Sequence, residues 1–435
     1  MAITALYVDG SAGADTNGGS SEGAAIVSGA SADTDGTTTV SLADDTPDLS
    51  GVSVGDSIFL AAETSGGQGN DSEVFEITAV DDGADTVTVT PTPGTNANQS
   101  WAIGGAFATI DHAMNVVAAG DHVNVKASAT YAELATIVTA GTATAPIVFT
   151  GYTASVGDGG QASIGGATGA HGITSSVASG QHYAFYNIRI TDCSSDGWQL
   201  NTRNHLAFIN CRADQCTNGF IAEDFCKFLA CEADNNSAKG ISWDTDCCMY
   251  GCVSHTNGDS PFDFNKGVIV NCLAYGLGAG DYGFEASNST FYWIIGNTVD
   301  GEGAATTRGF SIGSGGTPQM QMFIGNIAYD CATGAHHNRD FKEDLVSAYN
   351  LVNSNTANYS GMETFVGEQT GAPAFTDEAG NDYRPGSGSA AKANGVDAGF
   401  AMDGSSFIDI GAVQREEPAG GSGGLLMPNK RAGKQ

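Results

Sequence analysis

The sequence predicts an all-β fold: a single-stranded right-handed parallel β-helix with a short N-terminal capping helix and an inserted small β domain. Two short apolar phrases recur along the chain about every 20 to 29 residues. Glycine fills 61 of the 435 positions, which suits tight turns between short strands because glycine accepts backbone angles that other residues avoid. Hydrophobic residues make up 41% of the chain, too many for a disordered protein.

The first phrase marks one strand in each repeat. It occurs as FYNIRI, FINCRA, FLACEA, MYGCVS, IVNCLA, IIGNTV and FIGNIA, and its fourth residue is in turn Ile188, Cys211, Cys231, Cys252, Cys272, Asn297 and Asn326. The second phrase marks a further strand after a turn, as in DGWQL (196–200), YGFEA (282–286) and RGFSI (308–312). Both phrases alternate apolar and polar residues, the period of a strand with one buried face. Strands at this spacing bury that face by stacking coil on coil.

Stacked coils place equivalent residues above one another, about 4.8 Å apart. We therefore expect an inward structural ladder that consists of Cys211, Cys231, Cys252, Cys272, Asn297 and Asn326. A free thiol is small and apolar enough for such a column. Metal binding is the alternative, but no CxxC pair or histidine cluster accompanies the cysteines. Each amide is expected to bond the next, since a buried unpaired amide costs about 1–3 kcal/mol.

The repeats and their flanks divide the chain into five segments. Residues 1–21 form an N-terminal strand leading into the fold, and residues 22–100 form the inserted β domain, in which alternating strands are broken by Gly and Asp turns. The β-helix is expected over 101–345 and its closing segment over 346–415. Residues 416–435 are a glycine-rich linker with a basic tail.

A short amphipathic helix precedes the repeats. Ile110, Ala113, Met114 and Val117 fall at helical spacing on one side. An exposed coil end is a sheet edge that invites aggregation, and a helix laid across it removes that hazard. We therefore expect this helix to cap the N-terminal coil.

Several segments resemble the pectin-lyase-like right-handed β-helix family. They are LYVDG with GADTNGG (6–19), FATIDHAMNVVAAGDHVNVKASATYAE (107–133), PIVFTGY (146–152), GAPAFTDEAGNDYRPGSGSAAKANGVDAG (371–399) and IDIGAVQ (408–414). The resemblance implies the β-helix fold. It implies little about function, because that family includes lyases, hydrolases, adhesins and phage tailspikes.

The charge balance limits the class of partner. Forty-nine acidic and 16 basic residues give a formal net charge of −33. Such a surface repels phosphate backbones and anionic lipid, so we expect neither nucleic acid nor a membrane as a partner. The N-terminus shows no signal peptide, and no apolar stretch approaches the ~18 residues that span a bilayer. We expect synthesis in a host cytoplasm, which suits reduced cysteines.

The last residues differ in character from the rest of the chain. A linker, EEPAGGSGG (416–424), leads to an apolar and basic tail. The bland interpretation is a disordered terminus. The alternative is a tethered partner-binding peptide made of Leu425, Leu426, Met427, Lys430, Arg431 and Lys434.

Catalytic residues are weakly indicated. Asp214 and Asp234 lie one coil apart, and Lys239 nearby offers the base that lyases of this family require. The structural alternative is that Asp residues cap turn amides at coil corners. We therefore predict no catalytic site, with Asp214, Asp234 and Lys239 as the candidates if the chain is an enzyme. We also predict no metal site and no cofactor; calcium would serve only if the chain were a lyase.

The sequence favours a structural role over an enzyme. Our first hypothesis is a virion decoration or fibre protein that binds capsid or tail proteins or a host-surface glycan. It would be located in the virion as a homo-oligomer, with a trimer as one arrangement. A polysaccharide lyase or depolymerase acting on an acidic glycan is one alternative. A bacterial surface adhesin, extracellular or at the cell surface, is another.

Overall fold

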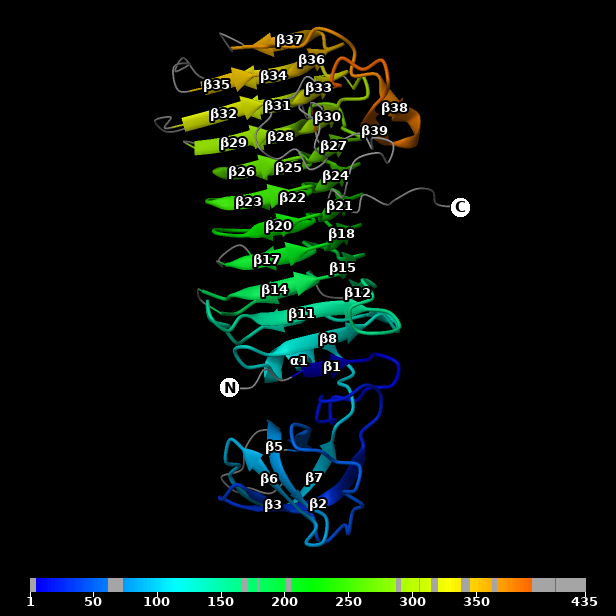
Figure 1. Cartoon of the computed structure of the whole chain (residues 1–435), viewed down its shortest axis with the longest axis vertical. Helices are drawn as coiled ribbons and strands as arrows, with labels where there is room; N and C mark the ends of the chain where they lie inside the picture. The colour runs from blue at the N-terminus through cyan, green and yellow to red at the C-terminus, as the bar shows by residue number, and fades with distance from the viewer. Residues whose placement is uncertain are drawn as a thin grey trace, which may run out of the picture. The chain divides into compact units, whose positions relative to one another are not determined.

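The computed structural model describes residues 5–61, 73–165, 171–177, 180–200, 205–286, 291–304, 306–313, 320–337, 345–361, 366–392 and 411. The chain divides into an N-terminal unit, Met1–Trp243, and a C-terminal unit, Asp244–Gln435. Each unit contains stacked parallel coils, and each coil contributes one short strand to each of three sheets (Figure 1). The predicted parallel β-helix with an inserted β domain is confirmed. No helix among the described residues is long and apolar enough to cross a membrane.

The inserted domain is a closed antiparallel barrel in the N-terminal unit. Its strands follow the order β2-β3-β6-β5-β4-β7. Their bounds are β2 (Val27–Asp35), β3 (Thr39–Ser41), β4 (Ser57–Leu60), β5 (Glu73–Asp81), β6 (Thr86–Thr90) and β7 (Thr95–Ile103). Alternate residues of these strands, among them Ile58, Phe75 and Trp101, fill the barrel and are almost fully buried. The barrel therefore has its own hydrophobic core.

The coils of the N-terminal unit build the three sheets by parallel pairing. The first sheet contains β1 (Ala5–Val8), β8 (His122–Lys126), β11 (Ile147–Tyr152), β14 (Tyr183–Tyr186), β17 (Leu206–Ile209) and β20 (Lys227–Leu229). The second contains β9 (Thr130–Tyr131), β12 (Ala162–Gly165), β15 (Ile188–Thr191), β18 (Arg212–Asp214) and β21 (Glu232–Asp234). The third contains β10 (Ala135–Ile137), β13 (Ile173–Ser175), β16 (Trp198–Leu200), β19 (Phe220–Ala222) and β22 (Ile241–Trp243).

The C-terminal unit repeats this arrangement. Its first sheet contains β23 (Cys247–Tyr250), β26 (Gly267–Val270), β29 (Phe291–Ile295), β32 (Met320–Ile324) and β35 (Leu345–Ala348). Its second contains β24 (Val253–His255), β27 (Leu273–Tyr275), β30 (Thr298–Asp300), β33 (Ile327–Tyr329) and β36 (Leu351–Asn353). Its third contains β25 (Phe262–Phe264), β28 (Tyr282–Ala286), β31 (Arg308–Ile312), β34 (Thr333–His337) and β37 (Ala357–Ser360).

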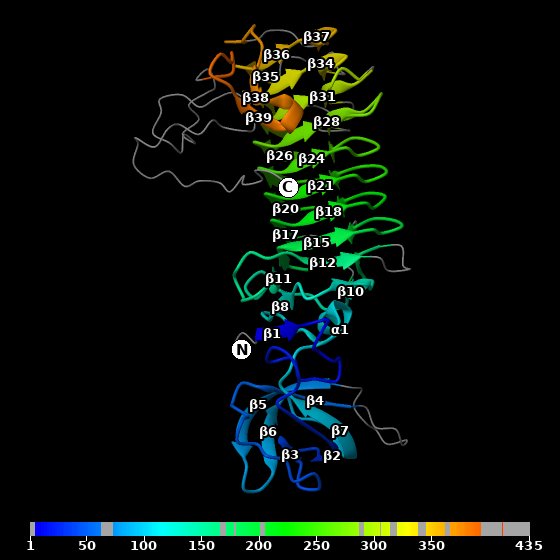
Figure 2. The same ribbon diagram turned by 90° about the vertical axis from the view of Figure 1, so that its right-hand side faces the viewer.

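A hairpin follows the last coil. It consists of β38 (Phe375–Asp377), the short 3-10 helix η1 (Glu378–Gly380) and β39 (Asp382–Pro385). Figures 1 and 2 place it against the second sheet of the C-terminal unit. Tyr383 contacts the ring of Tyr275, and Phe375 contacts the ring of Tyr329. The closing segment thus covers the outward face of that sheet.

The predicted short helix is α1 (Ile110–Val116). Its N-cap is Thr109, whose side chain accepts a hydrogen bond from the backbone N–H of His112. Ile110, Ala113 and Met114 are buried, as the helical spacing predicts. Glu133 accepts hydrogen bonds from the backbone N–H groups of Ile110 and Asp111, both at 2.8 Å.

Candidate functional site

The cysteines of the predicted ladder line the interior of both units. Cys211 and Cys231 in the N-terminal unit, and Cys252 and Cys272 in the C-terminal unit, are at most 1% exposed. All ten cysteines of the chain are free thiols, and Cys248 is the exposed one. Burial raises the pKa of the Cys211 thiol well above its ordinary value, so this column is unreactive packing rather than a chemical site.

The asparagines continue the column as a chain of hydrogen bonds. The backbone N–H of Asn297 donates to Oδ1 of Asn326 at 2.9 Å, and the side-chain Nδ2 donates to the same oxygen at 3.1 Å. Asn326 makes the same two bonds to Asn350, which in turn donates to Glu368. All three asparagines are completely buried. These residues hold coils together and leave no group for a ligand.

Asp214 and Asp234 are paired with arginines of the preceding coils. Arg189 forms a two-pronged ion pair with Asp214, with hydrogen bonds of 2.7 and 2.5 Å, and Arg212 does the same with Asp234 at 2.8 and 2.7 Å. The two aspartates are only 1% and 2% exposed. Burial opposes ionisation of Asp214, but its bond to Arg189 and the nearby charge of Arg212 hold its pKa below the ordinary value. Both carboxylates are therefore buried and engaged in ion pairs.

Lys239 lies in the turn before β22, and its backbone N–H donates to Oδ1 of Asn218 at 3.0 Å. Lys239 therefore directly precedes a strand of the third sheet, whereas Asp214 and Asp234 end strands of the second sheet. The tail residues Leu425, Leu426, Met427, Lys430, Arg431 and Lys434 lie outside the described residues.

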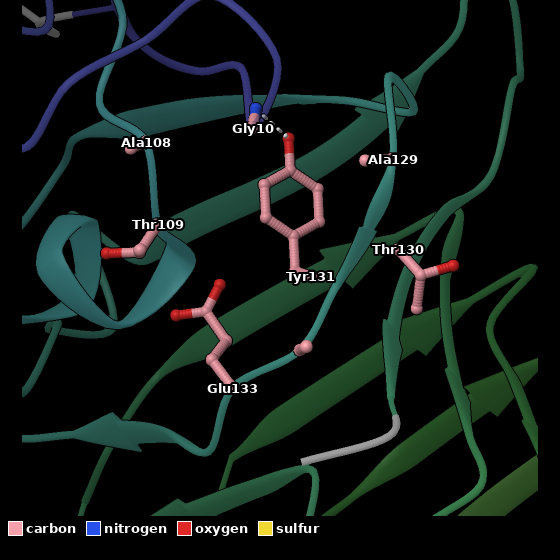
Figure 3. Close-up of a pocket in the computed structure, with 8 residues that line it drawn as sticks. Gly10, Ala108, Thr109, Ala129, Thr130, Tyr131 and Glu133 are labelled. Atoms are coloured by element: carbon pink, nitrogen blue, oxygen red, sulfur yellow. Dashed lines mark hydrogen bonds between the residues drawn. The ribbon is translucent and has the colours of Figure 1, made fainter.

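A cavity of about 170 Å³ lies beside α1 (Figure 3). Two of its polar side chains, those of Tyr131 and Glu133, are already engaged by backbone groups. Tyr131 accepts a hydrogen bond from Gly10 N–H at 3.1 Å and donates to the carbonyl of Lys126 at 2.7 Å. Glu133 caps the first turn of α1 with both carboxylate oxygens. The cavity therefore braces the N-terminal end of the coils, and we assign it no ligand.

The outward face of the third sheet in the C-terminal unit carries a different set of side chains. The strand register aligns one outward residue of each rung into what we call the polar ladder: Asp263, Glu285, Ser311, His336 and Ser360. The alternation of the strands explains this direction. Phe262, Phe284 and Phe310 point inward and stack at 4.8 and 4.9 Å, so the residue after each faces outward.

The polar ladder contains two carboxyl groups on adjacent rungs. Asp263 pairs with Glu285 across β25 and β28, and neighbouring strands lie about 4.8 Å apart. Glu285 is half-buried, whereas Asp263 is only 8% exposed. Glu285 accepts a hydrogen bond from the hydroxyl of Ser260 at 3.0 Å. On the same sheet, the guanidinium of Arg308 lies 5.3 Å from the ring centre of Tyr282. Carboxyl, hydroxyl and imidazole groups thus share one row of aligned positions.

The matching position in the N-terminal unit holds no charge. There the register aligns Thr136, Thr174, Gln199, Ile221 and Ser242. Acid–base chemistry on the third sheet is therefore confined to the C-terminal unit among these aligned positions. We take the polar ladder as the candidate site.

A second acidic group lies under the closing hairpin. The register of the second sheet aligns Asp300 with Tyr329, and Asp300 is completely buried. Burial raises its pKa to about 7, and the charges of Glu378 and Glu302 act in the same direction. Because the hairpin residue Tyr383 lies against it, Asp300 is inaccessible to a substrate.

The fold defines the chain as a parallel β-helix protein. No family model matches it, and no curated protein matches it in sequence. Among solved structures it is similar to pectate lyase Pel9A, with 16% identity, a TM-score of 0.48, and coverage of 72% of this chain and 92% of that one. A mannuronic acid specific family 6 lyase from human gut microbiota shows 13% identity, a TM-score of 0.32, and coverage of 57% and 75%. The tailspike protein gp49 from Pseudomonas phage LKA1 shows 13% identity, a TM-score of 0.19, and coverage of 81% and 65%. These likenesses concern the fold.

Proposed function

We propose that the chain is a glycan depolymerase that binds a polysaccharide along the third sheet of its C-terminal unit and cleaves it at the polar ladder. The observation that carries this proposal is the placement of Asp263 and Glu285 on adjacent outward rungs. Retaining glycosidases work with two carboxyl groups about 5 Å apart, and side chains on neighbouring strands, about 4.8 Å apart, can come that close. The proposal favours an enzyme over the structural role that the sequence favours.

The two carboxyl groups would divide the chemistry between them. One protonates the oxygen of the scissile glycosidic bond as that bond breaks, and the other attacks the anomeric carbon. Water then releases the sugar, and the first group takes the proton from that water. The hydroxyl of Ser260 orients Glu285, which suits the attacking group because a hydrogen bond stabilises a carboxylate. Asp263 would then be the acid.

The experiment measures new reducing ends after incubation of the full chain with a panel of neutral and acidic polysaccharides. Hydrolysis gives reducing ends without absorbance at ~235 nm, whereas elimination creates an unsaturated, absorbing end. We expect Asp263→Asn and Glu285→Gln each to lower the rate by about 10²–10⁴-fold. Asp330→Asn, a half-buried carboxylate outside the third sheet, is the matched control and should keep the wild-type rate. Product absorbing at 235 nm, or equal losses in all three variants, would refute the hydrolytic assignment.

A second candidate is a virion fibre or decoration protein that binds a host glycan without cleaving it. Exposed apolar side chains on the first sheet, among them Leu229 and Val346, favour this candidate, because parts of a particle need assembly contacts. Partners would then include capsid or tail proteins, and the location would be the virion. Mass spectrometry of purified particles, together with glycan binding that yields no product, would distinguish it from the depolymerase. An extracellular adhesin would bind glycan but would not copurify with particles.

A further inference from the structure

The first sheet of the C-terminal unit presents an outward surface made of apolar side chains. Two rows run along it in register. Together they form what we call the apolar face: Cys248, Val268, Trp293, Met322, Val346, Tyr250, Val270, Ile295 and Ile324. All nine are partly or largely exposed, and Val346 reaches 52%. In these strands the alternate residues, such as Ile269 and Ile294, already fill the interior, so the apolar face is not part of the core.

The absence of charge sets this face apart from the chain as a whole. None of its nine side chains is charged at neutral pH, although the whole chain carries a formal net charge of −33. The polar ladder on the third sheet shows that outward positions of the same coils accept charged side chains. A continuous exposed apolar surface is the usual sign of a binding interface, since leaving it in water is unfavourable.

The absence of charge indicates what covers the face. A basic or an anionic partner would be selected by complementary charge, and the face offers none. A second copy of this chain is repelled by like charge over most of its surface, and the apolar face is where two copies can approach without placing carboxylates together. Two copies also present the same rungs, spaced about 4.8 Å apart, so the ridges of one face fit the grooves of the other in an isologous contact.

The area of the face sets the strength of the contact. Five strands about 4.8 Å apart, each with about four to five residues at ~3.3 Å, make a surface of roughly 24 by 15 Å, or about 360 Å². A standard protein interface buries about 800 Å² on each partner. The apolar face is therefore large enough for the centre of an interface, and we expect association that reverses on dilution.

We infer that the apolar face is the surface through which copies of this chain associate. The inference is independent of the glycan depolymerase proposal, because it concerns another sheet and other residues. It also gives a location to the homo-oligomer that the sequence analysis expects.

The test measures molar mass by sedimentation velocity over about 1 to 100 µM. We expect the wild-type mass to rise with concentration, and to rise further between about 20 and 300 mM NaCl because salt screens the repulsion between acidic copies. Val268→Glu and Trp293→Glu, on different rungs, should each keep the mass of one chain. Asn353→Glu places the same charge on an outward rung of the second sheet and should associate like the wild type. Circular dichroism melting checks that every variant is folded.

Three results would overturn the inference. One is a wild-type chain that has the mass of one copy at every concentration. Another is association that persists in both face variants or is lost equally in Asn353→Glu. The third is that a chain ending at residue 415 associates while the full chain does not. Residues 416–435 of the same chain would then cover the face in place of a second copy. As a second readout, Cys248 on the face should react at least tenfold faster with a thiol reagent in Val268→Glu than in the associated wild type, and equal rates would contradict the inference.

Discussion

Replacement of the buried carboxyl group of Asp300 by an amide should stabilise the protein in a pH-dependent way. Asp300 is completely buried, and its Oδ1 accepts the backbone N–H of Glu302 at 2.9 Å. Burial raises its pKa from 3.8 to about 7. The native state therefore binds a proton more tightly than the unfolded state. The stability that the proton on Asp300 gives the native state is complete below about pH 4. It is lost as the pH rises to about 7.

The size of the effect follows from that window. Each pH unit across it corresponds to about 1.4 kcal/mol, so the interval of roughly 3 units gives at most about 4 kcal/mol. Relaxation around the charged group reduces this, and we expect about 2–4 kcal/mol. Asp300→Asn cannot ionise, and its Oδ1 can keep the bond to Glu302. The variant should match the wild type at pH 4 and exceed its free energy of unfolding by that amount at pH 8.

The assay is thermal unfolding followed by tyrosine and tryptophan fluorescence at pH 4, 5, 6, 7 and 8. For a unit of this size, 1 kcal/mol shifts the melting temperature by about 2–4 °C, so the difference at pH 8 should reach about 4–16 °C. Asp377→Asn is the control, because this exposed carboxylate caps η1 in the same hairpin and asparagine caps equally well. A variant that differs from the wild type by the same amount at pH 4 and pH 8 would refute the reasoning.

Three further predictions concern the coils. Asn326→Ala should lower the free energy of unfolding by about 2–4 kcal/mol, because it removes the buried acceptor of the Asn297 N–H and the donor to the carbonyl of Ile294. Asn353→Ala on the surface should cost under ~0.5 kcal/mol, and equal losses in chemical denaturation would contradict the ladder. Asp214→Asn should have a lower free energy of unfolding than the wild type at pH 7, and the two should converge as the pH falls below about 4, since the pKa of Asp214 is lowered in the native state. A difference in free energy that stays constant with pH would contradict this. Reducing agent should leave the melting temperature unchanged, since all ten cysteines are free thiols, and a fall would reveal a disulfide.

The repeat of the first phrase was sufficient to predict the coils. The recurrence of a cysteine at the same place in FINCRA and FLACEA predicts the column that holds Cys211 and Cys231, and stacking follows because each coil has one apolar face to bury. Strict alternation from Phe208 would turn Cys211 outward, but the left-handed backbone of Asn210 (φ 52°) interrupts the alternation and both side chains are buried. The prediction of at least two strands in each coil did not resolve the first sheet from the second, because the first phrase runs from a strand of one into a strand of the other, as from β17 to β18. Strands of three residues, such as β18 and β21, are too short for periodicity to separate them from turns.

The sequence analysis selected other acidic residues than those of the polar ladder for a different reason. Asp214 and Asp234 were selected as outward acids, and they do end strands of the second sheet, but the arginines at 189 and 212 cover them. Sequence spacing gives the rung of a side chain and not its partner. The signal for the polar ladder was present in the fourth residue of the second phrase, where a charge occurs only at Asp263 and Glu285. Comparison of that column between repeats would have found it.

The asparagine column has a direction with a consequence for the length of the protein. Every backbone N–H in it donates toward the next coil, from Cys272 to Asn297, then Asn326 and Asn350, and Glu368 receives the last bonds. A carboxylate accepts without needing a further acceptor, so Glu368 terminates the series. An added coil could be spliced between two asparagine-bearing coils without altering either neighbour. Growth beyond Glu368 would first require an amide at that position.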